Sequence, residues 1–135
     1  MNWKRFALAV VVVLVLNNVF GFLVHGMLLQ ADYANYPNLL RTQEDSANYF
    51  HWMLLNFVVF SVAFVWIYAQ GVEDKPWVGQ GLRFGLAVWF LTSVAGFLTY
   101  YAVQPWGGDI VVKQILYELP RGLVLGLAAA ALYRK

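Results

Sequence analysis

Apolar residues run through this sequence in four long blocks, and most polar residues gather in the segments between them. A helix needs roughly 20 mostly apolar residues, each rising about 1.5 Å, to cross the hydrocarbon core of a bilayer. The windows that meet this length lie near residues 6–29, 49–69, 82–103 and 109–133. Basic residues precede the first window, but its apolar run is too long for a signal peptide, so it is expected to remain as the first helix.

The composition agrees with this pattern, because 61% of the residues are hydrophobic and only 12% are charged. Such values, spread over the whole chain, are typical of an integral membrane protein. We therefore expect an all-α membrane protein, a bundle of four transmembrane helices that forms a single domain over residues 1–135. Since the chain has no cysteine, disulfides and thiolate metal sites are excluded.

The positions of the basic residues predict the orientation of these helices. Arg41 and Lys113 flank one side, and the other side carries Lys4, Arg5, Lys75, Arg83, Arg134 and Lys135. Under the positive-inside rule both termini are cytoplasmic, in the inner membrane of a bacterium, with the lipid bilayer as the first partner. Basic and aromatic residues are not interleaved as in a nucleic-acid interface, so nucleic acid is not an expected partner.

The fourth window contains the charged residues Glu118 and Arg121, which are costly inside a bilayer and usually serve a purpose there. Their i, i+3 spacing on a helix allows an ion pair. The other helices contribute further polar side chains to the same outer half of the bundle: Asn17, Asn18, His25, His51, Asn56 and Tyr100. The inner half is almost wholly apolar.

This outer cluster has two interpretations. Glu118 and Arg121 can neutralise each other while Asn17, Asn18 or Asn56 complete the hydrogen bonds of the guanidinium group, which fixes helix neighbours and nothing more. Alternatively, Arg121 binds an anionic or carbonyl group of a small ligand, with His25, His51 and Tyr100 completing the site. A guanidinium has five N–H donors, so donors left unpaired and facing a cavity would favour the ligand.

The two histidines are the only candidates for a metal site. His25 and His51, with Glu118 as a third ligand, would come from three different helices, without the fixed spacing typical of metal sites. We therefore predict no metal and no other cofactor. No nucleophile elbow, glycine-rich phosphate loop or HExxH motif is present, so the sequence does not indicate an enzyme.

Small residues recur at a spacing of four on two of the helices, a pattern that lets neighbouring backbones approach closely. Gly81 and Gly85 form one such pair, and a longer stripe consists of Gly122, Gly126 and Ala130. The contact they predict is with another helix, either within the bundle or on a partner chain.

Four strings resemble a family of small, uncharacterised bacterial four-helix integral membrane proteins. They are HGMLL with a following tyrosine (25–33), QGVEDK then GQGLRFGL (70–86), YYAVQPW (100–106) and YELPRGLVLGLAAAALYRK (117–135). The resemblance implies the four-helix fold and identifies no substrate.

Three functions are consistent with these observations. The first expectation is a non-catalytic accessory or scaffold subunit of a larger membrane complex, acting through association with other subunits or with itself. The alternative is a small-ligand binder or transporter that uses the outer-half polar residues. A third is a membrane enzyme acting on a lipid or quinone through Glu118 and a histidine.

Overall fold

The computed structural model describes residues 1–134, which form helices and loops without a β-strand. Four helices are long and apolar enough to cross a membrane: Trp3–Leu28, Phe50–Gly71, Trp77–Val103 and Gly108–Leu132. The prediction of an all-helical chain with four potential spans is therefore confirmed. Lys135, one of the basic residues assigned to the inner side, lies outside the described residues.

Two of the long helices contain a π-helical segment, and two short helices lie in the first long loop. In chain order the elements are α1 (Trp3–Gly21), η1 (Phe22–Leu28), α2 (Gln30–Tyr33), α3 (Gln43–Ala47), α4 (Phe50–Gly71), α5 (Trp77–Trp89), η2 (Phe90–Val94), α6 (Ala95–Val103) and α7 (Gly108–Leu132). The elements η1 and η2 are π-helical, and each continues the axis of the helix before it.

The third long helix begins at Trp77, five residues earlier than the apolar window at 82 indicates. Hydropathy misses this first part because Gln80 and Arg83 are polar. Pro76 precedes the first helical residue, a position where its missing N–H costs nothing. The first helix likewise begins early, at Trp3, where the side chain of Asn2 accepts a hydrogen bond from the Arg5 amide at 3.1 Å.

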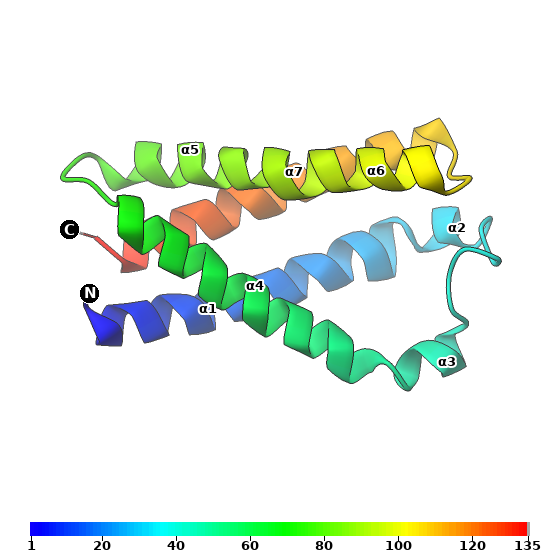
Figure 1. The fold of residues 1–135 in the computed structure, drawn as a ribbon, viewed down its shortest axis with the longest axis horizontal. Coiled ribbons are helices and arrows are strands. Elements are labelled where there is room, and N and C mark those ends of the chain that lie inside the picture. Colours follow the sequence, from blue (N-terminus) through cyan, green and yellow to red (C-terminus); the bar gives the residue numbers. More distant parts are fainter. Residues whose placement is uncertain (135) are drawn as a thin grey trace.

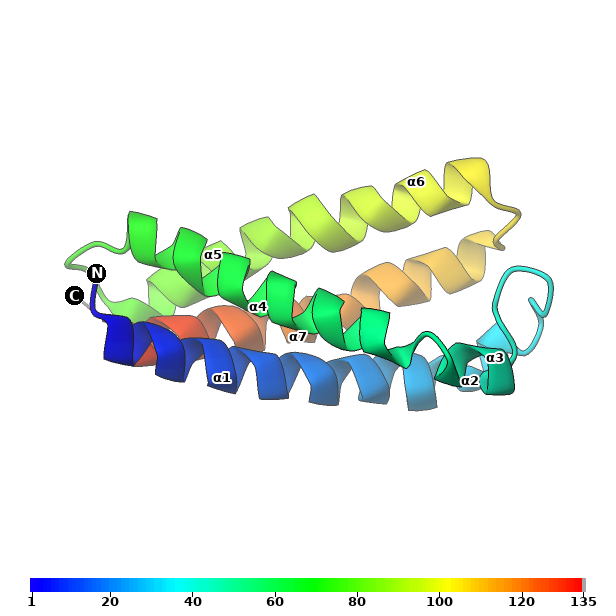
Figure 2. The ribbon, with the colours of Figure 1, turned by 60° about the horizontal axis from the view of Figure 1, so that its bottom comes forward.

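Figure 1 shows the long helices as two pairs, with α4 crossing α1 and the α5–α6 rod running along α7. Both termini lie at one end, which we call the terminal end. They are tied together there, since the Asn2 amide donates to the Tyr133 hydroxyl at 3.1 Å and the Arg5 guanidinium donates to the Arg134 carbonyl at 2.9 Å. The opposite end, which carries α2 and α3, is the cap end (Figure 2).

The buried apolar core lies between α1, α4 and α7 in the half nearest the terminal end. It consists of Ala9, Val13, Phe64, Val65, Tyr68, Leu125, Ala129, Ala130 and Tyr133. Toward the cap end the polar side chains of Gln114 and Glu118 are buried as well, alongside the apolar residues Val24, Leu29, Ile110 and Val111. The apolar half therefore fixes the helices, and the cap-end half holds the candidate site.

The small-residue stripes of α5 and α7 pack against each other. A Cβ atom built on Gly81 would lie 2.7 Å from the Gly126 carbonyl oxygen and 2.9 Å from the Ala130 Cβ. One built on Gly85 would lie 2.9 Å from the carbonyl carbon of Gly122. Both stripes are thus covered inside the bundle, and they are not available to a partner chain.

Candidate functional site

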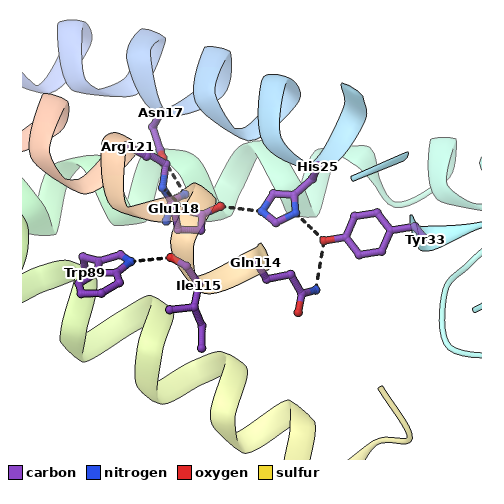
Figure 3. Close-up of polar contacts among 8 residues, drawn as sticks. All are labelled: Asn17, His25, Tyr33, Trp89, Gln114, Ile115, Glu118 and Arg121. Atoms are coloured by element: carbon purple, nitrogen blue, oxygen red, sulfur yellow. Dashed lines mark hydrogen bonds and ion pairs between the residues drawn. The ribbon is translucent and has the colours of Figure 1, made fainter. Parts of the chain in front are cut away.

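The centre of the site is Glu118, a carboxylate only 2% exposed and held between two basic side chains (Figure 3). Its Oε1 atom lies 2.7 Å from His25 Nε2, and its Oε2 atom lies 2.5 Å from Arg121 Nε. The second contact lacks the alignment of a hydrogen bond and is an ion pair. The ion pair predicted from the i, i+3 spacing is therefore confirmed, and a histidine from η1 joins it.

The hydrogen bonds around His25 form a chain in which each side chain donates to the next, from Gln114 to Glu118. Gln114 Nε2 donates to the Tyr33 hydroxyl at 3.2 Å, so that hydroxyl is free to donate its own proton to His25 Nδ1, 2.6 Å away. Nδ1 then acts as an acceptor, and Nε2–H donates to the Glu118 carboxylate. In this assignment of protons both ring nitrogens of His25 have a hydrogen-bond partner, and the charge of Glu118 is balanced by Arg121.

Tyr33 is positioned by the short helix α2 at the cap end. Its ring makes an edge contact with Trp106, with 6.0 Å between ring centroids, and neighbouring Asp32 pairs with Lys113 of α7 at 2.8 Å. Burial raises the pKa of the Tyr33 hydroxyl above its ordinary value of 10.0, and the negative charges of Glu118 and Asp32 raise it further, while the hydrogen bond from Gln114 lowers it. The hydroxyl therefore stays protonated and serves as a donor.

Arg121 has hydrogen-bonding capacity to spare. Its Nη1 donates to Asn17 Oδ1 at 3.1 Å and its Nε faces Glu118. Five N–H groups are available on a guanidinium, so three of them have no hydrogen-bond or ion-pair partner among residues 1–134, and the group also lies over the Phe60 ring, 5.7 Å from its centroid. Unpaired N–H donors, where they face a cavity, favour the interpretation in which Arg121 binds a ligand.

A cavity of about 490 Å³ lies beside Arg121, within the range of small-molecule sites. Its wall is largely aromatic and its polar groups are few. The lining residues are Asn18, Gly21, Phe22, His25, Phe50, Met53, Asn56, Phe57, Phe97 and Arg121. They come from α1, η1, α4, α6 and α7, and the α4 residues, all within 50–57, place the cavity on the cap-end side of the point where α4 crosses α1 (Figure 1).

Both π-helical segments border this region. His25 belongs to η1, while Thr92 and Ser93 of η2 line a small space next to Arg121 and Glu118. A π-helical turn carries an extra residue and is frequent at functional sites. In η1 this turn carries His25, whose ring reaches Glu118.

Some residues expected in the site lie elsewhere. His51 is exposed at the start of α4 and packs its ring on Trp52, 5.1 Å between centroids, without lining the cavity. Tyr100 is 53% exposed on α6 and likewise takes no part. Both residues were predicted in the site from their depth along the helices. Depth does not determine which face of a helix points into the bundle.

The three asparagines predicted in the site make different contacts. Asn17 alone completes a hydrogen bond of Arg121. Asn18 lines the cavity and donates its amide to the Leu14 carbonyl of its own helix at 2.9 Å, while its Oδ1 atom has no hydrogen-bond partner among residues 1–134. Asn56 of α4 lines the cavity wall facing Arg121. Two of the three therefore belong to the cavity and one to the ion pair.

Two residues of the network were not expected. Tyr33 falls outside every apolar window, and Gln114 is not among the residues that the sequence predicts in the site. A signal for Gln114 existed in its spacing of four from Glu118. No such signal in the sequence indicated Tyr33, because the position of α2 over the end of the bundle depends on tertiary contacts.

No cluster of three or more histidine, aspartate and glutamate side chains that could hold a metal occurs among residues 1–134. His25 and Glu118 meet as a pair, while His51 lies apart from both. A metal site built on the two histidines is therefore not supported by this arrangement.

No known protein family, curated protein or solved structure matches this chain. The resemblance to a family of small bacterial membrane proteins stays a prediction. The function must be inferred from the site itself.

Proposed function

We propose that this chain is a multi-pass membrane protein that binds a small amphiphilic molecule in the cavity beside Arg121. The observation that carries the proposal is the set of unpartnered guanidinium N–H groups at a cavity with aromatic walls. Those donors suit the polar end of a ligand, and Phe22, Phe57 and Phe97 suit its apolar body. A purely structural ion pair would leave no need for such a cavity.

The membrane setting has two supports. Large apolar side chains remain exposed along the long helices, for example Val11, Val15, Leu91 and Ile67, as expected for surfaces that face lipid. The basic residues favour an orientation with the terminal end in the cytoplasm, in the inner membrane of a bacterium. With that orientation the cavity lies in the outer half of the bilayer, where an amphiphile can enter from the lipid.

The competing proposal, an accessory or scaffold subunit, rested in part on small-residue stripes left for a partner. These stripes face each other within the bundle, since Gly81 and Gly85 pack against Gly122, Gly126 and Ala130. Association with other subunits stays a prediction without a specific surface to support it. The enzyme proposal is also weaker, because both ring nitrogens of His25 are engaged and neither is free to act as a base toward a bound ligand.

The test is native mass spectrometry of the protein extracted gently from its own membrane, combined with a cavity-filling variant. Met53→Trp places a bulky ring in the cavity, and Met27→Trp is the matched control because Met27 is similarly exposed, 57% against 50%, but does not line the cavity. We expect a defined small-molecule adduct on the wild type and on Met27→Trp, and its loss from Met53→Trp. A wild-type chain without any adduct, or with a partner chain in fixed stoichiometry instead, contradicts the proposal.

A further inference from the structure

The charges around the cavity specify the kind of polar group that it accepts, and this inference rests on the proposed function. The titratable or charged side chains facing the cavity are His25 from η1 and Arg121 from α7, with Glu118 directly behind them. The lining residues from α1, α4 and α6 are uncharged. The charged and titratable groups that line the cavity or lie directly behind its wall therefore form one triad.

Within this triad the ion pair of Glu118 and Arg121 carries no net charge. Glu118 is 2% exposed and balances Arg121 across 2.5 Å. Both ring nitrogens of His25 are engaged, Nδ1 by the Tyr33 hydroxyl and Nε2 by Glu118. An anionic head group would thus bring an uncompensated charge into an environment of low dielectric constant, where the cost of desolvation exceeds what an already paired guanidinium returns.

A second cation near the mouth of the cavity is also neutralised. Arg41 belongs to an adjoining cavity of about 420 Å³ that shares Phe50, Met53 and Asn56 with the first. It pairs with Asp45 at 2.9 Å and lies over the Tyr49 ring, 3.6 Å from the centroid. The hydrogen bond to Asp45 raises the pKa of Arg41 and holds it in this arrangement. Neither cation is thus left to attract an anion.

The cavity does, in contrast, offer both hydrogen-bond donors and a hydrogen-bond acceptor. Arg121 offers N–H donors to a carbonyl oxygen, and such a bond with one charged partner is stronger than a neutral one. Asn18 Oδ1 offers an acceptor, since the amide nitrogen of that side chain is occupied by the Leu14 carbonyl. A head group that combines a carbonyl oxygen with an N–H or O–H donor matches both.

We propose that the cavity selects amphiphiles with a neutral carbonyl head group, of the carboxamide class, over anionic ones, and that Glu118 sets this selectivity. Glu118 does not reach the ligand itself. It acts by cancelling the charge of Arg121, so its removal should convert a site for neutral groups into a site for anions.

The experiment compares two probes with equal chains, dodecanamide and 1-dodecanesulfonate, whose sulfonate is ionised at any working pH. Their dissociation constants are measured on the full chain in phosphatidylcholine nanodiscs. For the wild type we expect the amide to bind about tenfold or more tightly than the sulfonate. A wild-type preference for the sulfonate overturns the inference, whereas failure of both probes to bind overturns the proposed function beneath it.

The variant Glu118→Gln tests the role of the carboxylate, with Glu44→Gln as its control because Glu44 is an exposed acid of α3. We expect Glu118→Gln to shift the ratio of the two constants about tenfold or more toward the sulfonate, and to be stabilised against heat by the sulfonate. Glu44→Gln should keep the wild-type ratio. An unchanged ratio in Glu118→Gln contradicts the assigned role, and the wild-type comparison remains decisive if that variant does not fold.

Discussion

His25 Nε2 donates a hydrogen bond to Glu118 Oε1 at 2.7 Å, across a sequence separation of 93 residues. Through this bond the π-helical end of the first long helix is fixed to the middle of α7. The same histidine accepts from Tyr33 of the cap. One side chain thus connects the ion pair in the bundle with the short helix that covers it, and the shape of the cavity depends on it.

Replacing this histidine should loosen the site measurably. In His25→Ala the buried Glu118 oxygen and the Tyr33 hydroxyl both lose a partner, which we expect to cost about 1–3 kcal/mol and to lower the apparent Tm in mild detergent. His51→Ala is the control, because His51 is exposed and has only a ring contact with Trp52. Equal effects of the two variants would contradict the central position assigned to His25.

The hydroxyl of Tyr33 is expected to contribute on its own. Tyr33→Phe leaves His25 Nδ1 and Gln114 Nε2 without their shared partner, so we predict a loss of about 1–2 kcal/mol in thermal unfolding. Tyr100→Phe removes a hydroxyl from an exposed ring outside the network and should unfold like the wild type. A Tyr33→Phe protein as stable as Tyr100→Phe would remove Tyr33 from the network.

The raised pKa of Tyr33 predicts a pH dependence with a definite sign. The folded protein favours the neutral phenol, so this stabilisation is complete below the unfolded-state pKa of about 10.0 and is lost as the pH rises through the higher folded-state value. Unfolding midpoints measured from pH 8 to 11 should therefore fall more steeply for the wild type than for Tyr33→Phe. Parallel curves would show that Tyr33 does not ionise differently in the two states.

Close packing of α5 on α7 predicts a strong effect of a single methyl group. In Gly126→Ala the new Cβ would lie 2.8 Å from the backbone nitrogen of Gly85, so the two helices must separate, at a cost of about 1–3 kcal/mol or more. Gly96→Ala is the matched control on α6, since a Cβ built there meets no other helix or side chain of residues 1–134 within 4 Å. Chemical denaturation of both variants measures the difference, and a Gly126→Ala protein as stable as Gly96→Ala contradicts this packing.

Much of the fold could be predicted from the sequence, because the length of an apolar run needed to span a bilayer is nearly independent of detail. The contact between Glu118 and Arg121 could also be anticipated, because residues three apart in sequence lie on the same face of a helix. The helix starts at Trp3 and Trp77 and the π-helical segments could not be predicted, since they depend on backbone hydrogen bonds rather than on hydropathy. Tyr33 belongs to the site although it was not predicted there, and His51 lies outside the site although it was predicted in it. The rotation of a helix about its axis and the position of α2 over the bundle are set by tertiary contacts.

Photolabelling can show whether an amphiphile occupies the cavity between α1 and α4 beside Arg121. The probe is a long-chain carboxamide with a diazirine near its amide, used on the protein in lipid nanodiscs and mapped by mass spectrometry of the digested chain. We expect labels on Met53, Phe57 or Phe22 that excess dodecanamide suppresses. Labels spread equally over lipid-facing positions such as Val11 and Leu91, without competition, would contradict it.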